Sequence, residues 1–263
     1  MAMSLKELRK NPMYLNSIIL HGNNKLLDYD DTTTDKKIRY AQFNTRAITD
    51  CPFKSKGCEK ICYATKGNHV FPSVKNSREK SYNDSKKENF AECMIYTIET
   101  EQTTKRYKGN IMLMRIHESG DFYSIQYLRK WVKVWAHFTG KNGIHFTLYT
   151  KSFPFFLMLT KEEKETVNKA MESGILSINL SIDDTTSTEQ KIAYLKCLVT
   201  FPKANTYICT EDVETVAHDE KCDCADCGKC GICNRAEGKR TAVIIHSASN
   251  NDMENYRKYA EQG

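Results

Sequence analysis

The stretch "NIMLMRIHESGDFYSIQYLRKWVKVWAHF", residues 110–138, decides the fold. Residues 110–117 form an apolar run with branched side chains, which is typical of a buried strand. After a short polar turn, residues 123–138 repeat apolar side chains at helical spacing. The face that they share carries Ile125, Leu128, Val132 and Trp135. The stretch therefore predicts a strand, a turn and an amphipathic helix in direct succession.

The same unit recurs downstream. Further strands are predicted over residues 144–150, 174–182, 205–210 and 241–246, and helices over 153–173 and 187–201. Strands that alternate with helices through short connections imply right-handed crossovers and a mainly parallel sheet. We expect an α/β fold whose sheet curls into a partial (β/α) barrel, with a cysteine-rich C-terminal loop. An open doubly wound sheet is the alternative.

One domain accounts for the chain. With 263 residues, 40% of them hydrophobic, the sequence can bury one large core. We therefore expect a single α/β domain over residues 1–263. Residues 1–109 form a less regular part that carries the first cysteine motif, with a helix over 73–101 as its clearest element. Residues 110–250 contain the β/α repeats and the late cysteines.

Hydropathy and charge limit where in the cell the protein can be and what it can bind. The N-terminus has no uninterrupted apolar core, and no stretch approaches the ~18 apolar residues that cross a bilayer. We expect a soluble cytoplasmic protein without a membrane partner. The net charge of +6 is spread along the whole chain, so it permits contact with nucleic acid but forms no basic stripe.

Cysteines are the strongest chemical signal. In a reducing compartment, the eleven cysteines are more often held by metals or used in chemistry than joined in disulfides. Five of them crowd into "KCDCADCGKCGICN", residues 221–234. A zinc ribbon needs a spacer between its two C-x2-C pairs, and this run has none. C-x2-C-x2-C is the spacing of the bacterial ferredoxin run and favours a [4Fe-4S] cluster, with zinc as the alternative. The candidate ligands are Cys224, Cys227, Cys230 and Cys233.

A second set lies upstream in "CPFKSKGCEKICYA", residues 51–64, which contains Cys51, Cys58 and Cys62. Cys58 and Cys62 are one helical turn apart, so both sulfurs can face one ion or cluster. A three-cysteine motif beside a parallel barrel resembles radical S-adenosylmethionine enzymes, in which three thiolates leave one iron open. The spacing here is C-x6-C-x3-C rather than their usual C-x3-C-x2-C. S-adenosylmethionine is therefore a candidate cofactor, beside one or two [4Fe-4S] clusters.

Polar side chains follow the predicted strands where each strand ends. In parallel α/β folds, ligands gather at these ends. We call the polar residues at the strand ends the rim. The segment "RIHESGDF" continues directly from an apolar strand into a glycine turn, which favours a functional role of the rim over the ordinary polarity of loops. Cys209 ends a strand on the same rim and is the leading candidate to complete the late cluster, followed by Cys51. The candidate rim residues are Arg115, His117, Glu118, Asp121, Lys151 and His246.

Several of these blocks together resemble the gene product eighty-eight family of tailed phages and prophages. They are "NNKL" (23–26), the upstream cysteine block, "RIHESGDFYSIQYL" (115–128), "LYTKS" (148–152), and the late cysteines followed by a strand that ends in histidine. The resemblance covers about residues 20 to 250. It implies a phage origin, the host cytoplasm as location, and iron-sulfur content through Cys51, Cys58, Cys62, Cys209 and three late cysteines. It implies no particular activity.

Three functions remain open. The favoured one is a phage-encoded [4Fe-4S] protein whose strand-end pocket binds a small molecule or redox partner, as in a radical S-adenosylmethionine or other redox enzyme. The second is a non-catalytic protein in which clusters carry electrons or support the structure. The third is a zinc-dependent module that binds nucleic acid.

Overall fold

The computed structural model describes residues 3–21, 28–31, 36–210, 220–222, 233, 236–244, 253–254 and 257. These residues build one eight-stranded sheet in the order β1-β2-β3-β4-β5-β6-β8-β7. Its strands are β1 (Tyr29–Asp31), β2 (Lys36–Phe43), β3 (Ile111–Ile116), β4 (Ile144–Thr150), β5 (Leu176–Asp183), β6 (Asn205–Thr210), β7 (Glu220–Cys222) and β8 (Arg240–Ile244).

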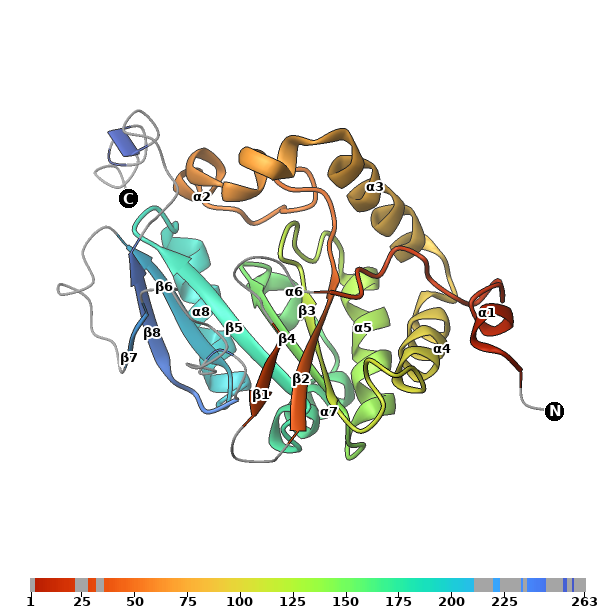
Figure 1. Cartoon of the computed structure of the whole chain (residues 1–263). Coiled ribbons are helices and arrows are strands. Elements are labelled where there is room, and N and C mark those ends of the chain that lie inside the picture. The colour runs from red at the N-terminus through yellow and green to blue at the C-terminus, as the bar shows by residue number, and fades with distance from the viewer. Residues whose placement is uncertain are drawn as a thin grey trace.

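The sheet is curved and open (Figure 1). Strands β2, β3, β4, β5, β6 and β8 run parallel in this order, and short β7 extends the parallel edge. Only β1 pairs antiparallel, with β2, among the named strands. The predicted partial (β/α) barrel is confirmed.

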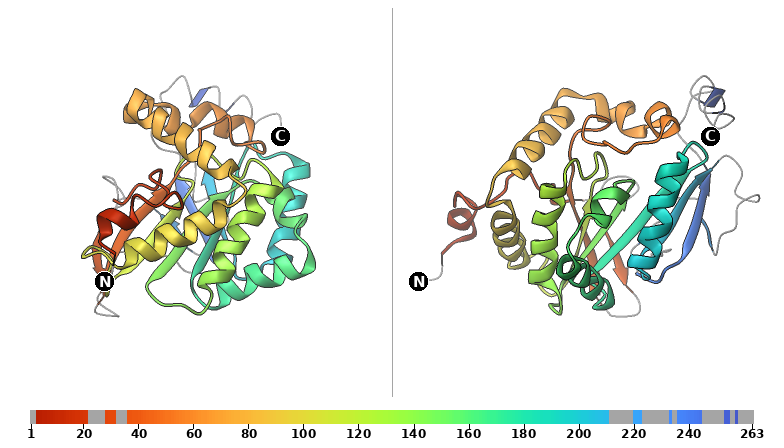
Figure 2. Two further views of the ribbon diagram at one scale, coloured as in Figure 1. Left: turned by 90° about the vertical axis from the view of Figure 1, so that its right-hand side faces the viewer. Right: turned by 180° about the vertical axis from the view of Figure 1, so that it is seen from behind.

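Helices lie on one face and across one end of this sheet (Figures 1 and 2). The outer face is covered by α4 (Phe90–Gln102), α5 (Ile125–Phe138), α6 (Phe153–Leu157), α7 (Lys161–Glu172) and α8 (Thr188–Thr200). The carboxyl ends of the strands are crossed by α2 (Lys56–Ile61), η1 (Tyr63–Thr65), η2 (Gly67–Val70) and α3 (Pro72–Lys86). Near the N-terminus, α1 (Leu5–Leu8) is a single turn with a capping box.

The unit of β3 and α5 shows why the sequence folds this way. Side chains alternate across a strand, and Met112, Met114 and Ile116 face the helices. The Ser124 side chain caps α5 by accepting a hydrogen bond from the Tyr127 amide at 3.2 Å. The helix then buries Trp131 and Trp135 completely, and each large apolar side chain contributes roughly 1.5–3 kcal/mol when removed from water.

Two predicted helices are each divided in the structure. The helix predicted over 73–101 breaks between α3 and α4, because Lys87 leaves the helical backbone at φ −55° and ψ 137°. The helix predicted over 153–173 breaks between α6 and α7. There Thr160 and Glu163 form a capping box, and this local start signal prevents one continuous helix.

The N-terminal part contains a strand, β2, that was not predicted from the sequence. Its sequence, KKIRYAQF, places Ala41 and Phe43 against the helices and Ile38 and Tyr40 on the opposite face. Lysine, arginine and glutamine interrupt the apolar pattern, so periodicity alone did not reveal the strand. The first parallel strand thus comes from residues 36–43.

We call the partial barrel formed by this sheet the half-barrel. Its inner face, opposite the helices, is polar. Asn205 donates from Nδ2 to Oδ1 of Asn179 at 3.2 Å. The carbonyl oxygen of Cys233 accepts hydrogen bonds from Thr147 Oγ1 at 3.0 Å and Asn179 Nδ2 at 2.9 Å. One residue of the late cysteine run therefore lies against the middle of β4 and β5.

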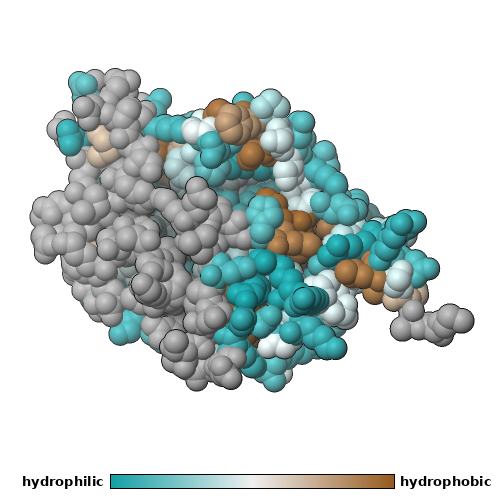
Figure 3. Space-filling model, viewed as in Figure 1, coloured by the Kyte–Doolittle hydropathy of each residue, from teal (hydrophilic) through white to brown (hydrophobic). Residues whose placement is uncertain are grey.

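Most of the described surface in Figure 3 is hydrophilic, with brown apolar atoms in a few small areas. No described helix is long and apolar enough to cross a bilayer.

Candidate functional site

The upstream cysteines lie on one loop, residues 51–62, which we call the cysteine loop. Ser55 caps α2, because its Oγ accepts a hydrogen bond from the Cys58 amide at 3.1 Å. Cys58 lies within α2, and Cys62 is its C-cap residue. The predicted separation of one helical turn between these two residues is confirmed.

The cysteine loop is tied to the carboxyl end of β5. Ser55 Oγ donates to Oδ2 of Asp183 at 2.5 Å. The Gly57 amide donates to Oγ1 of Thr185 at 2.8 Å, and the Thr185 amide donates to Oδ1 of Asp183 at 2.9 Å. Asp183 therefore holds the loop that follows β2 across the mouth of the half-barrel.

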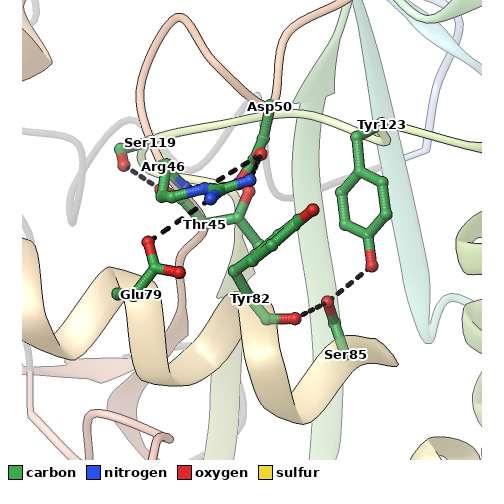
Figure 4. A network of polar contacts seen from close by, with 8 residues as sticks. All are labelled: Thr45, Arg46, Asp50, Glu79, Tyr82, Ser85, Ser119 and Tyr123. Carbon is green, nitrogen blue, oxygen red and sulfur yellow. Dashed lines mark hydrogen bonds and ion pairs between the residues drawn. The ribbon is translucent and has the colours of Figure 1, made fainter. Parts of the chain in front are cut away.

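A second set of contacts holds the start of the loop (Figure 4). Arg46 forms an ion pair with Asp50 at 2.7 Å, and its guanidinium lies 3.3 Å from the centre of the Tyr82 ring on α3. Glu79 of α3 lies 3.4 Å from the same guanidinium. The Asp121 amide donates to the Asp50 carbonyl at 3.1 Å, which joins this network to the end of β3.

The three thiols of the cysteine loop are free and half-buried, and they influence one another. Burial raises the pKa of Cys58 to about 11, with Asp183 and Cys62 adding to the rise and Lys151 opposing it. Burial also raises the pKa of Cys51, and Asp121, Cys58 and Cys62 raise it further. The pKa of Cys62 is raised by burial as well. Without a bound cation, these thiols are therefore protonated at neutral pH.

The thiols of the cysteine loop can be compared with the ligands that zinc and iron-sulfur clusters require. No group of three histidine, cysteine, aspartate or glutamate side chains among the described residues is arranged to hold a single metal ion. A tetrahedral zinc ion binds sulfur at about 2.3 Å, so its ligand sulfurs must lie within about 4 Å of each other. A cubane binds its thiolates at separate iron corners and needs them farther apart. The cysteine loop offers three free thiols as sulfur donors.

Lys151 and Asp183 form a buried ion pair beside these thiols, with Nζ 2.8 Å from Oδ2. Burial alone would raise the pKa of Asp183, but Lys151 and hydrogen bonds from Ser55 and Thr185 lower it. Burial alone would lower the pKa of Lys151, but Asp183 outweighs it and the pKa is raised. Both groups are therefore charged in the fold.

Asp121 joins the ends of β3 and β4. It accepts hydrogen bonds from Thr150 Oγ1 at 2.7 Å, the Lys151 amide at 2.9 Å and the Phe122 amide at 2.7 Å. Burial raises its pKa to about 6, although these donors oppose the rise. The structure thus brings the rim candidates Asp121 and Lys151 together, and Lys151 also reaches Asp183 at the end of β5.

Cys209 lies with the upstream cysteines. Its backbone pairs with Asp183 across β5 and β6. Burial raises its pKa to about 12, while Lys151 opposes the rise and Asp183 and Cys58 add to it. Of the predicted late ligands, only Cys233 is described, and Cys224, Cys227, Cys230 and rim candidate His246 lie outside the described residues.

The family model described as gene product 88 matches residues 17–236. This chain belongs to the gene product 88 family. The resemblance to this phage protein family is thereby confirmed, and the match contains the cysteine loop and the rim from Arg115 to Asp183. No curated protein and no solved structure matches the chain.

His117 of this gene product 88 protein does not face the rim. Its backbone has a left-handed φ of 60°, which turns the ring toward the helices. Nε2 lies 2.9 Å from the Tyr127 hydroxyl, and the ring contacts Phe122. Burial lowers the pKa of His117 to about 3, so the ring is neutral. The structure therefore corrects the prediction that His117 contributes to the strand-end pocket.

Arg115 and Glu118 remain on the inner side. Arg115 lies with its guanidinium carbon 4.0 Å from the centre of the Tyr149 ring. The Glu118 amide donates to Oδ1 of Asn44 at 2.7 Å, and its carboxylate accepts from Nδ2 of Asn44 at 3.4 Å. These bonds join the loops that follow β2 and β3.

Sequence reasoning missed several residues that position the gene product 88 site. Ser55 carries a recognisable signal, because a serine before K-G-C can cap a helix. Arg78 of α3 donates to the Ala64 carbonyl at 3.0 Å and is buried behind Cys62, but nothing in its helical segment marks it. Thr185 accepts the Gly57 amide hydrogen bond only because the end of β5 meets the cysteine loop in space.

Proposed function

We propose that this gene product 88 protein binds a [4Fe-4S] cluster through Cys51, Cys58 and Cys62. The supporting observation is that one anchored loop holds three free thiols together over the carboxyl ends of a parallel half-barrel. The thiols raise one another's pKa because their deprotonated sulfurs would repel, and the positive charge of bound iron offsets this repulsion when the protons leave. Binding would therefore stabilise the loop as well as the metal.

Three thiolates leave one iron of a cubane without a protein ligand, where a small molecule can bind. A three-cysteine loop after the first parallel strand of a half-barrel resembles the arrangement in radical S-adenosylmethionine enzymes. We therefore favour an enzyme and S-adenosylmethionine as the candidate ligand. In this chain, Lys151 supplies a positive charge beside the anionic thiolates, and Asp183 holds both Lys151 and the loop.

A specific observation favours a second candidate function. Cys209 lies close enough to Cys58 for the Cys58 thiol to raise the pKa of Cys209. If Cys209 supplies a fourth thiolate, all irons are ligated by the protein, and the cluster carries electrons without binding a substrate. The late cysteines remain proposed ligands of a further cluster or of zinc, in which case the nucleic-acid-binding module is the third alternative.

The test is iron and acid-labile sulfide content after anaerobic purification and reconstitution. We expect a brown protein with visible absorption, and each of Cys51→Ser, Cys58→Ser and Cys62→Ser should lose most of the iron bound by the upstream site. Cys93→Ala and Cys197→Ala are matched controls, because both thiols are buried in the core away from the loop. They should keep full iron content. A colourless wild-type protein with stoichiometric zinc would contradict the proposal.

A further inference from the structure

Arg115 is a cation on the inner face of the half-barrel. Its backbone lies between Gln42 of β2 and Thr147 of β4. The Tyr149 ring holds one side of the guanidinium, with 4.0 Å between the guanidinium carbon and the ring centre. Nε of Arg115 is buried and has no hydrogen-bond partner within the part of the chain that the structure describes.

Arg115 forms no ion pair with the described residues, although Glu118 is near enough to raise its pKa. Nε of Arg106 is also buried without a partner, but Arg106 pairs with Asp28 at 2.8 Å. Arg9 and Arg46 each form an ion pair of 2.7 Å, with Glu101 and Asp50 respectively. Arg78 donates to a backbone carbonyl at 3.0 Å. A buried donor without a partner is costly, and a guanidinium cannot remove the cost by losing its proton. Native structures retain such groups where a ligand completes them.

Aromatic and polar side chains surround Arg115. The Tyr149 and Tyr207 rings meet edge to face, with 4.8 Å between their centres, which gives an aromatic wall beside the guanidinium. Thr147 and Asn179 extend the polar inner face below it. Side chains of these kinds can contact the polar groups of a ligand.

The cysteine loop reaches the same place through Tyr63. Tyr63 follows Cys62 in the chain, and its hydroxyl donates to the carbonyl oxygen of Glu118, three residues after Arg115. A molecule bound at Arg115 therefore lies under the proposed cluster site.

We propose that Arg115 binds the oxyanion, a carboxylate or a phosphate, of the small molecule that enters this half-barrel. The proposal rests on the proposed function for the neighbouring cluster and deepens it by giving the ligand a chemical class. A guanidinium presents a planar fork of donors that matches either oxyanion with two parallel hydrogen bonds. Contact with Tyr149 fixes the plane of that fork before the ligand arrives.

The test is calorimetric titration of reconstituted full-length protein with succinate and, separately, with inorganic phosphate, at constant ionic strength set by chloride. We expect saturable binding of at least one anion, and the preferred anion identifies the ligand as carboxylate or phosphate. Arg115→Met should weaken this binding at least tenfold, and Arg115→Lys should weaken it less because the charge remains. Arg129→Met is the control, because Arg129 pairs with Glu163 on the outer helices, and it should bind like wild type.

Visible absorption of the same samples separates this proposal from the cluster proposal. Arg115→Met should keep the cluster absorption while losing anion binding. A colourless wild-type protein that still binds the anion would refute the cluster and leave the Arg115 site intact. Absence of saturable binding for both anions, or equal binding by Arg115→Met and wild type, would overturn the Arg115 site.

A second measurement covers the case in which Arg115→Met does not fold. In protein labelled with ¹⁵N-arginine, the Nε–H signal missing from Arg115→Lys belongs to Arg115. Addition of succinate or phosphate should shift this signal in the wild type while the Arg129 signal stays in place. An Arg115 signal that does not move at saturating anion would also overturn the proposal.

Discussion

Lys151 Nζ lies 2.8 Å from Asp183 Oδ2, and the two buried side chains join the end of β4 to the end of β5. The carboxylate also accepts hydrogen bonds from Ser55 on the cysteine loop and from Thr185. A buried ion pair is tolerated when the remaining donors and acceptors of both side chains form hydrogen bonds. A buried charge left without its partner strongly destabilises the fold. The pair therefore couples the stability of the sheet to the position of the thiols.

Removal of Lys151 should show this coupling. Lys151→Met leaves the Asp183 carboxylate buried without its cation and should lower the free energy of unfolding by about 3–5 kcal/mol. The double variant Lys151→Met/Asp183→Asn should recover a large part of that loss, because no buried charge remains. Urea denaturation measures both, with Lys141→Met as a control at the exposed Glu99 pair. Equal stability of Lys151→Met and Lys141→Met would show that the pair is not needed.

Ser55 should affect both stability and metal content. Ser55→Ala removes the cap of α2 and the bond to Asp183, which should cost about 1–2 kcal/mol. It should also lower iron occupancy, because the cysteine loop loses an anchor. Ser187→Ala is the matched control, since Ser187 caps α8 in the same way, through the Gln190 amide at 3.3 Å. The control should lose about 1 kcal/mol for the cap alone and no iron. Equal iron loss in both variants would contradict a specific role of Ser55.

His117 should make the fold sensitive to acid. Its pKa is lowered to about 3 by burial, compared with about 6.5 in the unfolded chain, so between these values the unfolded state binds more protons. The stability is therefore unaffected by this residue above pH 6.5 and falls as the pH decreases through the window. At pH 5 the loss is about 2 kcal/mol.

The measurement is urea denaturation at pH 7.5 and pH 5 of wild type and His117→Gln. The variant should lose less stability than wild type between the two pH values. Some sensitivity should persist in it, because burial also lowers the pKa of His145, to about 4. If both proteins lose equal stability, His117 is not buried in its neutral form.

Cys209 should distinguish the two proposed functions. With an open iron, Cys209→Ala should keep the iron and visible absorption of the upstream cluster, whereas Cys58→Ala should lose them. Electron paramagnetic resonance of the reduced cluster should change when S-adenosylmethionine is added to Cys209→Ala and to wild type alike. Cys209 would be the fourth cluster ligand if Cys209→Ala loses iron and the wild-type spectrum does not change when S-adenosylmethionine is added. This result would support the electron carrier.

Local periodicity determined much of the fold. The strands over 144–150 and 205–210 were predicted with the bounds that the structure has, because their apolar and β-branched residues form short runs between clear turns. The turn between Cys58 and Cys62 also follows from spacing alone. The parallel order of the strands follows from the alternation of strands and helices.

Tertiary structure decided what the site contains. The polar pattern of β2 becomes a strand only because β1 and β3 pair with it on either side. A left-handed backbone at His117 turns that ring away from its rim neighbours, and the sequence carries no sign of it. Cys209 lies near Cys58, far from it in the chain, because parallel crossovers bring distant strand ends together. Composition and spacing thus determined which residue types are present, while the packing of loops over the strand ends determined which of them meet.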